Sequence, residues 1–399
     1  MTPAIGIHDL AVATSRHMLT HAVLADRLGT DPVKYQRGLG QDAMSIPGDD
    51  EDVVTMAAAA AAPIVERHGA SRIRNVFFAT ETGVDESKCA GLYLHSLIGL
   101  PSQARVVEFK QACYGGTAAL QLACAAVARD PSRQALVIAA DIARYDLDSA
   151  AEPTQGAGAV AMLVSADPAV AVIDPVSGLF SSDIMDFWRP TYRSTAVVDG
   201  RYSVSAYLDA IEHAFDDFRR LGGVDLREFE RFCYHQPFTK MAFKAHRHLL
   251  EHAGLPVTDE AVDAALADTT DYNRAIGNSY TASVYMALAS VLDSASDLTG
   301  RRIALASYGS GCVAEFLSLT AVDGYREQLR SETNRAAIGN RNPLSYSEYR
   351  ALHTDRTTAH DGSRASTGDS GGTYRLSGFE EHKRIYHARQ PASSAEVGH

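Results

Sequence analysis

The sequence predicts an α/β fold whose sheets are buried on both faces. Short runs of β-branched and aromatic residues alternate along the chain with alanine-rich stretches of helical length. Several of the short runs are apolar throughout, as expected for strands that helices cover on both sides. A chain of 399 residues, 46% of them hydrophobic, is long enough to bury a large core between such layers.

Six short segments have the composition of buried strands, and five longer ones are predicted helices. The strands are Asn75–Ala79, Arg105–Phe109, Ala135–Ala140, Gly158–Val164, Phe232–Tyr234 and Arg302–Ser307. The helices are Glu51–His68, Gly116–Ala128, Ser205–Arg220, Thr239–Ala253 and Asn278–Ser294. Strand-then-functional-residue units recur in both halves, which is compatible with a weak duplication.

The C-terminal part of the chain changes character. The stretch from Leu352 to Gly378 is rich in Ser, Thr, Gly and Asp and has almost no apolar content. Such a composition is typical of a mobile surface excursion. The last ten residues, QPASSAEVGH, are expected to be frayed.

Charge and cysteine content exclude several classes of function. The net charge is -12, so a nucleic-acid or anionic-membrane surface is not expected. No basic segment followed by an apolar one opens the chain, and the longest charge-free apolar stretch, Val53 to Val65, is too short to cross a bilayer. The five scattered cysteines form neither a disulfide framework nor a metal motif. We therefore expect a cytoplasmic protein without a metal site.

Cys113 lies where a nucleophile is expected. An apolar strand ends near Phe109, and a helix of small residues begins near Cys113, with Gly115 and Gly116 leaving room for a substrate. Unpaired N–H groups at a helix start favour a thiolate over a thiol. The alternative is a small core residue, which is the interpretation we favour for Cys124.

Glu81 also follows a buried strand, in the segment NVFFATETG. A carboxyl group desolvated at a strand end has a raised pKa, which suits a general base. The alternative is a solvated loop acid, the interpretation we give to Asp85 and Glu86.

His235 is a third candidate at a strand end, and Pro237 follows it. Lys240 and Lys244 are spaced i, i+4 on the next predicted helix, so they share one face. A cationic face beside a reactive site suits phosphates, although such faces are usually only solvated. His246 and His248 are expected at the surface.

Two further segments are less specific. Asn278 either caps the helix that follows it or belongs to a site. The turn SYGSG, from Ser307 to Gly311, ends a strand and could bind an oxyanion through its backbone N–H groups.

Taken together, these segments resemble the 3-hydroxy-3-methylglutaryl-CoA synthase family of the thiolase superfamily, in its bacterial mevalonate-pathway type. The resemblance runs through KYQRGLGQDAMSIPGDDEDVVTMA, FATETG, EFKQACYGGTAAL, PTQGAGAVAML, DFWRP, YHQPFTKM and SYGSG, in the family's order. It implies a layered αβαβα fold built from two related halves, residues 1–168 and 169–399, and a homodimer.

The resemblance also implies roles for single residues. Cys113 would be the acyl-accepting nucleophile, Glu81 the general acid/base and His235 the partner of the acetoacetyl group. The implied substrate-binding positions are Asp141, Tyr145, Thr154, Asp186, Asn278 and Ser310. Lys240 and Lys244 match positions that approach the phosphates of coenzyme A.

The implied reaction condenses acetyl-CoA with acetoacetyl-CoA through an acetyl-cysteine, with no metal, nucleotide or flavin. The nearest alternative is the polyketide β-branching subgroup, which acts on β-ketoacyl chains bound to an acyl carrier protein. The segments QDAMSIPGDDEDVVTMA and PTQGAGAVAML favour the CoA-dependent enzymes. More distant alternatives are a ketoacyl synthase or thiolase, a Cys-His hydrolase and a non-catalytic acyl-binding relative.

Overall fold

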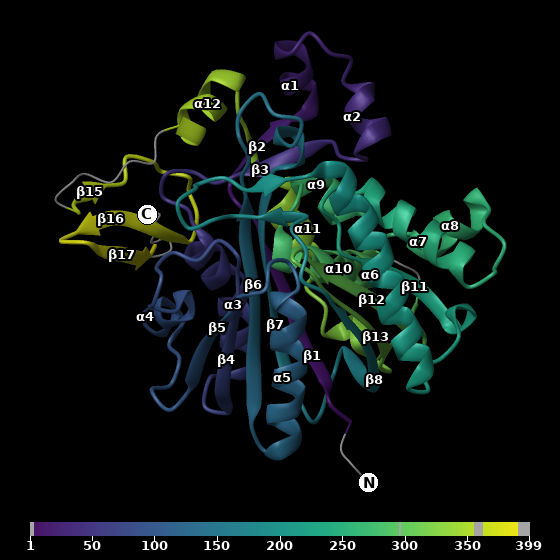
Figure 1. Cartoon of the computed structure of the whole chain (residues 1–399). Helices are drawn as coiled ribbons and strands as arrows, with labels where there is room; N and C mark the ends of the chain where they lie inside the picture. The colour runs from purple at the N-terminus through teal and green to yellow at the C-terminus, as the bar shows by residue number, and fades with distance from the viewer. Residues whose placement is uncertain (1–3, 295–296, 355–361, 390–399) are drawn as a thin grey trace, which may run out of the picture.

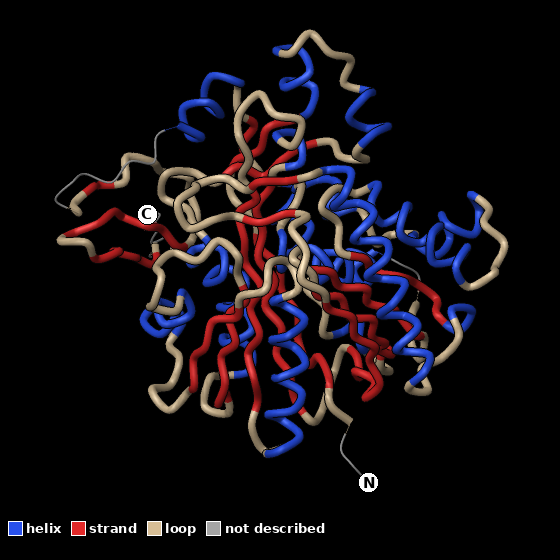
Figure 2. The backbone as a smooth tube through the Cα atoms, in the orientation of Figure 1, coloured by secondary structure: helices blue, strands red, loops and turns tan. Residues whose placement is uncertain are grey.

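A single nine-stranded mixed sheet runs through the computed structural model, which describes residues 4–294, 297–354 and 362–389 (Figures 1 and 2). The α/β prediction is therefore confirmed. In spatial order the strands are β11 (Phe229–Tyr234), β12 (Arg302–Gly309), β13 (Val313–Ala321), β8 (Ala171–Ser181), β1 (Gly6–Ala13), β7 (Gly156–Ser165), β6 (Gln134–Ala143), β4 (Ile73–Ala79) and β5 (Arg105–Phe109).

The sheet consists of two halves with matching topology. In the first, β1 pairs antiparallel with β7, β7 antiparallel with β6, and β6 parallel with β4. The second half repeats this order of pairings: β8 pairs antiparallel with β13, β13 antiparallel with β12, and β12 parallel with β11. The halves meet where β1 pairs with β8 at Gly6 and Val172. The turn between β7 and β8 contains the boundary proposed from the sequence, and the position of that boundary stays a prediction.

Helices separate and cover the two halves as layers. Both α5 (Gly115–Arg129) and α10 (Ser283–Ser294) lie in the core cluster that contains strand residues of both halves. The outer face of the first half is covered by α3 (Val53–His68), and that of the second by α6 (Gly200–Arg220) and α7 (Lys240–His252). The αβαβα order follows, as the family resemblance implies. No described helix is both long enough and apolar enough to cross a membrane.

The central layer needs a glycine where its elements cross. A Cβ atom on Gly116 would lie 2.7 Å from the carbonyl oxygen of Thr281 and 3.0 Å from the ring of Tyr285. The first turn of α5 can therefore approach the start of the α10 segment only without a side chain. This close approach brings the turn before α5 against the second half of the chain.

Sequence reasoning misses β1, β8 and β13 because acidic residues interrupt their apolar patterns. Asp9 in β1 is fully buried; it forms an ion pair with Arg330 at 2.7 Å and a hydrogen bond with the His68 ring at 2.9 Å. Glu315 in β13 is also buried and accepts a hydrogen bond from Tyr114 at 2.8 Å. Buried acids are tolerated when they are paired in this way.

The remaining elements surround these layers. Small sheets are formed by β2 (His17–Thr20), β3 (Ala43–Ile46) and β14 (Asn342–Pro343), by β9 (Phe187–Trp188) and β10 (Val197–Val198), and by β15 (Arg364–Ala365), β16 (Tyr374–Glu380) and β17 (Lys383–Ala388). The other α-helices are α1 (His21–Arg27), α2 (Val33–Gly38), α4 (Leu94–Ile98), α8 (Asp259–Leu266), α9 (Asp271–Ile276), α11 (Ser331–Gly339) and α12 (Tyr346–Thr354).

The prediction of a mobile surface excursion from Leu352 to Gly378 is wrong for the C-terminal part of this stretch. Asp49 accepts hydrogen bonds from Arg364 and from the Thr367 N–H, and the buried Asp50 accepts from the Ser370 N–H. Carboxylates thus hold this polar segment against the body, a contact that composition does not reveal. Residues 355–361 and the tail QPASSAEVGH lie outside the described residues.

The expectation that His246 is at the surface is also wrong. His246 is 2% exposed, packs against the Phe232 ring and lies 3.0 Å from the Tyr234 hydroxyl. Burial lowers its pKa to about 4, so it is neutral at neutral pH. His248 is half-buried and lies 2.8 Å from Glu212.

The start of α3 provides a test of how the sheet formed by β15, β16 and β17 is attached to the rest of the protein. Asp52 accepts from the N–H groups of Val54 and Thr55, and from the Tyr386 hydroxyl at 2.6 Å. We expect Asp52→Ala to lower the free energy of unfolding by about 2 kcal/mol, because the cap and a buried hydroxyl both lose their acceptor. The measurement is equilibrium urea denaturation.

The matched control is Thr258→Ala, which removes only the exposed cap of α8. It should cost about 1 kcal/mol or less. Equal losses in the two variants would contradict the attachment through Asp52.

Candidate active site

Cys113 lies in a tight turn between β5 and α5, two residues before the helix begins. Ala112 adopts a left-handed backbone with φ of 42°, which turns the chain sharply at this point. Cys113 is only 6% exposed. The strand–turn–helix arrangement is the one expected from the sequence.

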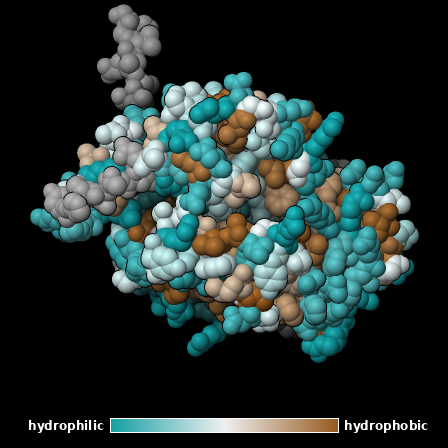
Figure 3. All heavy atoms as spheres, turned by 45° about the horizontal axis from the view of Figure 1, so that its top comes forward, coloured by the Kyte–Doolittle hydropathy of each residue, from teal (hydrophilic) through white to brown (hydrophobic). Residues whose placement is uncertain are grey.

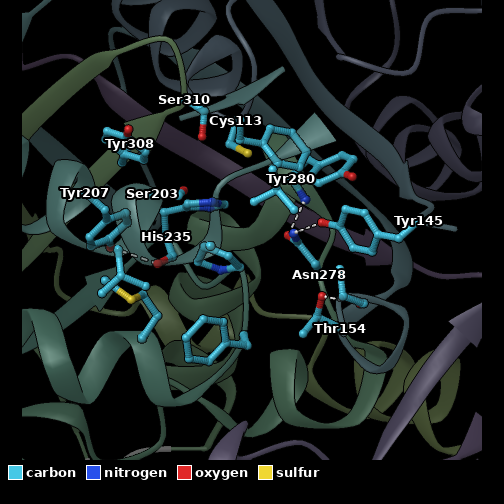
Figure 4. A pocket seen from close by; sticks show the side chains of 18 of the residues that line it. Cys113, Tyr145, Thr154, Ser203, Tyr207, His235, Asn278, Tyr280, Tyr308 and Ser310 are labelled. Carbon is cyan, nitrogen blue, oxygen red and sulfur yellow. Dashed lines mark hydrogen bonds between the residues drawn. The ribbon is translucent and has the colours of Figure 1, made fainter. Parts of the chain in front are cut away.

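The exposed end of Cys113 opens into a cavity of about 380 Å³ formed by both halves. Figure 4 shows Cys113, His235 and Asn278 around the same space. Six of the residues singled out from the sequence line it: Cys113, Tyr145, Thr154, His235, Asn278 and Ser310. At its outer end Val198 is exposed, and apolar side chains lie in patches among hydrophilic ones on the face that Figure 3 turns forward.

Glu81 lies behind Cys113 rather than in this cavity. The Cys113 thiol donates a hydrogen bond to the Glu81 Oε1 atom at 3.0 Å. Burial and the nearby Asp141 carboxylate raise the pKa of Glu81 to about 8, against weaker opposing effects of the Cys113 hydrogen bond and of Arg189. A carboxyl group with such a pKa can accept and return a proton near neutral pH.

The expectation of a thiolate at Cys113 is wrong for the free enzyme. Burial, and then the Glu81 carboxylate, raise the pKa of the Cys113 thiol well above its usual value. The helix start does not compensate, because the sulfur faces a carboxylate at hydrogen-bond distance. Attack by this sulfur therefore requires that its proton be removed, and Glu81 is the group in contact with it.

Asp141 holds Glu81 in place and does not line the cavity. Its fully buried carboxylate accepts from the N–H groups of Glu81, Thr82 and Thr281. The hydroxyl groups of Thr80, Thr82 and Thr281 donate to it as well. We therefore revise the implied substrate contact to a positioning role.

Asp186 has a similar role on the other side of the cavity. It is fully buried and accepts from the Tyr308 hydroxyl at 2.8 Å, the Gly311 N–H at 2.9 Å and the Ser203 hydroxyl at 3.2 Å. These bonds fix the turn that carries Ser310. Asp186 does not line the cavity either, so its implied substrate contact is revised in the same way.

His235 lies at the end of β11, where its N–H bonds to the Ala306 carbonyl at 2.9 Å and its own carbonyl accepts from Tyr207 at 2.9 Å. Burial lowers its pKa to about 3. The imidazole is therefore neutral at neutral pH. Its Nδ1 atom has no hydrogen-bond partner among the described residues.

Asn278 does not cap α10, which begins five residues later. Its Oδ1 atom accepts from the Tyr280 N–H at 2.9 Å, and its amide donates to the Tyr145 hydroxyl at 3.4 Å. Thr154 donates to the Ala151 carbonyl at 2.8 Å (Figure 4). These side chains form one wall of the cavity.

Lys240 and Lys244 lie on the first turns of α7 but do not line the cavity. Their ammonium groups lie 4.5 Å from the Phe243 ring centre and 5.3 Å from the Phe238 ring centre. Neither has an ion-pair partner among the described residues. Phe238 does line the cavity, so the pair lies close to it.

Sequence reasoning misses the aromatic lining. Phe187, Tyr207, Tyr280 and Tyr308 line the cavity and are at most partly exposed. Phe187 and Tyr308 lie within segments singled out for other reasons, DFWRP and SYGSG, and Tyr280 lies within the predicted helix Asn278–Ser294. Tyr207 lies on a predicted helix, where an aromatic residue is more often part of the core.

The Glu81–Cys113 hydrogen bond gives a prediction on pH. Removing the Glu81 charge removes a cause that raises the thiol pKa, so thiolate forms at lower pH in Glu81→Gln. We expect the midpoint of the pH dependence of Cys113 alkylation by iodoacetamide to shift downward, measured by peptide mass spectrometry. Glu108→Gln, which changes a partly buried acid on β5, is the control. An unchanged or higher midpoint in Glu81→Gln would contradict the coupling.

Comparisons with known proteins agree with this geometry. The family model for the hydroxymethylglutaryl-coenzyme A synthase N terminal matches residues 2–169, and the one for the C terminal matches 171–253 and 247–389. The Enterococcus faecalis hydroxymethylglutaryl-CoA synthase is 40% identical over 88% of this chain and 92% of its own. The Bacillus subtilis polyketide biosynthesis 3-hydroxy-3-methylglutaryl-ACP synthase is 34% identical over 87% of both chains.

Solved structures agree as well. A crystal structure of HMG-CoA synthase complexed with CoA has a TM-score of 0.91 and 36% identity, over 97% of this chain and 100% of the other. The curacin biosynthetic pathway HMG synthase in complex with holo donor-ACP has a TM-score of 0.90 and 31% identity, with the same coverage. With both family models matched across nearly its whole length, the chain belongs to the hydroxymethylglutaryl-CoA synthase family, whose structures have the thiolase-like fold.

Proposed function

We propose that this enzyme condenses acetyl-CoA with acetoacetyl-CoA and water to give 3-hydroxy-3-methylglutaryl-CoA and CoA. The observation that carries the proposal is the 3.0 Å hydrogen bond from the Cys113 thiol to Glu81, at the end of a cavity that His235 and Asn278 also line. Higher identity to the CoA-dependent relative than to the carrier-protein-dependent one supports CoA thioesters as substrates.

The first step transfers the acetyl group to Cys113. Glu81 accepts the thiol proton as the sulfur attacks the acetyl-CoA carbonyl, and the proton then leaves with CoA. The sulfur cannot ionise readily in its buried position, so this proton acceptor is needed. Asn278 and the turn at Ser310 border the same space and would orient the acyl group.

The second step forms the carbon–carbon bond. Glu81, again ionised, removes a proton from the acetyl methyl group, and the carbanion adds to the ketone of acetoacetyl-CoA. His235 is neutral, so it donates a hydrogen bond to the developing alkoxide rather than acting as a cation. The alkoxide then takes up the proton that Glu81 removed, which gives the tertiary alcohol and leaves Glu81 ionised again. Water then cleaves the thioester to Cys113. These steps use only CoA thioesters and water, so we propose that the enzyme needs no metal, nucleotide or flavin.

The edge of the sheet supports a homodimer. Strand β5 ends the sheet, and Val107 on it is 40% exposed. Leu122 on the neighbouring helix α5 is 50% exposed. An edge with unpaired backbone groups and apolar side chains suits two-fold pairing with a second copy. The five free thiols fit a reducing compartment, so we place the enzyme in the cytoplasm.

The central test is acetylation of the intact protein. Incubation with acetyl-CoA should add the mass of one acetyl group, and Cys113→Ala should abolish the gain because Cys113 is the one cysteine among the residues that line the cavity. Cys124→Ala, a matched change on α5 outside the cavity, should still be acetylated. Absence of any mass gain in the wild-type enzyme would overturn the proposal. Faster acetylation from an acetyl-carrier protein than from acetyl-CoA would favour the β-branching alternative.

The lysine pair gives a second prediction. We propose that Lys240 and Lys244 bind the CoA phosphates, since both are cationic, lie near the cavity and have no ion-pair partner among the described residues. The double replacement by Ala should raise KM for both substrates roughly tenfold and leave kcat nearly unchanged, the pattern of lost uniform binding.

Lys383→Ala in the C-terminal sheet is the control and should change neither constant. Steady-state kinetics decide the matter: a large fall in kcat at constant KM in the double variant would contradict a role in phosphate binding.

A further inference from the structure

One wall of the cavity is formed by the connection between two strands of the first half. Strand β6 ends at Ala143 and β7 begins at Gly156. The structure describes all of residues 144–155, and their one regular element is a 3₁₀ turn, Glu152–Thr154. Four residues of the connection line the cavity, namely Tyr145, Ala150, Ala151 and Thr154 (Figure 4 shows Tyr145 and Thr154 on the same side of it). Contacts from outside must therefore help to fix the course of this wall.

The backbone of Tyr145 is held by two side chains. Its N–H donates to the Gln155 Oε1 atom at 2.9 Å, and its carbonyl oxygen lies 3.0 Å from the Nε2 atom of His353 on α12. The Tyr145 ring belongs to the apolar cluster that contains Cys113, and its hydroxyl accepts from Asn278. The positions of Gln155 and His353 thus determine where the ring lies beside the reactive sulfur.

Tyr349 connects α12 to the same network. Its hydroxyl accepts from the Gln155 amide at 2.7 Å and donates to the Glu152 Oε1 atom at 2.8 Å. The other carboxylate oxygen of Glu152 accepts from the Asp148 N–H at 2.6 Å. Tyr349, Gln155 and Glu152 are each at most 2% exposed. Without the hydroxyl, a buried amide and a buried carboxylate would both lose a partner that water cannot readily replace.

The Tyr349 ring is itself fixed by packing. It lies in an apolar cluster formed with residues of the N-terminal elements, which are Leu19, Leu24, Met44 and Ile46. A packed ring holds its hydroxyl at one place, so the two hydrogen bonds restrict the connection from a rigid support.

We propose that Tyr349 is a positioning residue for the reaction, which acts through Gln155 and Glu152 on the wall that carries Tyr145; this inference rests on the proposed function. The acyl group on Cys113 lies against this wall, whereas the CoA phosphates are proposed to bind at Lys240 and Lys244. Loosening the wall therefore disturbs the orientation of the reacting group and leaves substrate uptake nearly unchanged. Lost orientation appears in kcat.

Removing one hydroxyl group tests the inference. Tyr349→Phe should lower kcat about tenfold and change KM for both CoA substrates by less than about twofold. Exchange of the acetyl methyl protons with deuterated solvent should slow in parallel. Tyr346→Phe is the matched control, because it removes a hydroxyl on the same helix that is bonded to Arg350 outside this network. It should change neither constant.

Two further variants separate positioning from a loss of folded enzyme. Gln155→Leu should also lower kcat, and the double variant with Tyr349→Phe should lose less than the product of the two single losses, because both act through one contact. His353→Ala, at a partly exposed position, should give a smaller fall in kcat at constant KM. Acetyl incorporation into Tyr349→Phe, followed by intact mass spectrometry, should still reach one group per chain.

An unchanged kcat in Tyr349→Phe would overturn the inference. So would independent effects of Tyr349 and Gln155 in the double variant, or a fall in kcat that matches a fall in the acetylated fraction. Failure of the wild-type enzyme to acetylate would instead overturn the proposed function.

Discussion

The geometry of the active site depends on one buried carboxylate, that of Asp141. It lies on β6 in the first half of the chain and receives hydrogen bonds from Thr80, Glu81 and Thr82 after the neighbouring strand. It also receives two from Thr281, which belongs to the second half. Three N–H groups and three hydroxyl groups donate hydrogen bonds to the carboxylate, and these offset the free-energy cost of burying it. The same group therefore shapes the Glu81 turn and ties the two halves together.

The charge of Asp141 matters as much as its hydrogen bonds. An anion next to the Glu81 carboxyl group opposes a second negative charge, and burial acts in the same direction. Asp186 has only a positioning role, in the second half, where its hydrogen bonds hold the turn that carries Ser310. Because Asp186 does not contact Glu81, it does so without changing the proton affinity of the base. Asp141 thus sets both the position and the basicity of Glu81, whereas Asp186 sets only the position of the Ser310 turn.

Much of this site could be predicted from the sequence because its reactive residues follow a simple rule. Glu81 and His235 each follow a buried strand, and Cys113 lies in a strand–turn–helix unit. Apolar runs show where such strands end, so these positions can be located without a structure. The convergence of the three around one site was implied only by the family resemblance.

What could not be predicted concerns contacts between distant segments. Nothing in the residues around Asp141 and Asp186 indicates that their oxygens are saturated by backbone and hydroxyl donors. The thiolate expectation for Cys113 failed for the same reason, since the helix start is visible in the sequence and the facing carboxylate is not. The segment after Leu352 was misjudged because its partners, Asp49 and Asp50, lie some three hundred residues away. Local sequence patterns indicate local structure, whereas each of these errors comes from a polar contact between residues far apart in the sequence.

The unusual proton affinities of the site follow from a single requirement, that one buried proton be moved several times. The thiol of Cys113 and the carboxyl of Glu81 are 3.0 Å apart, and both have raised pKa values. A thiol that ionised on its own would leave Glu81 without a proton to pass to the departing CoA, whereas an ordinary carboxylate would be too weak a base for a methyl group beside a thioester. Raising both pKa values together keeps the proton within the pair and makes its acceptor strong. His235, held neutral by the same burial, can then stabilise the new alkoxide without competing for that proton.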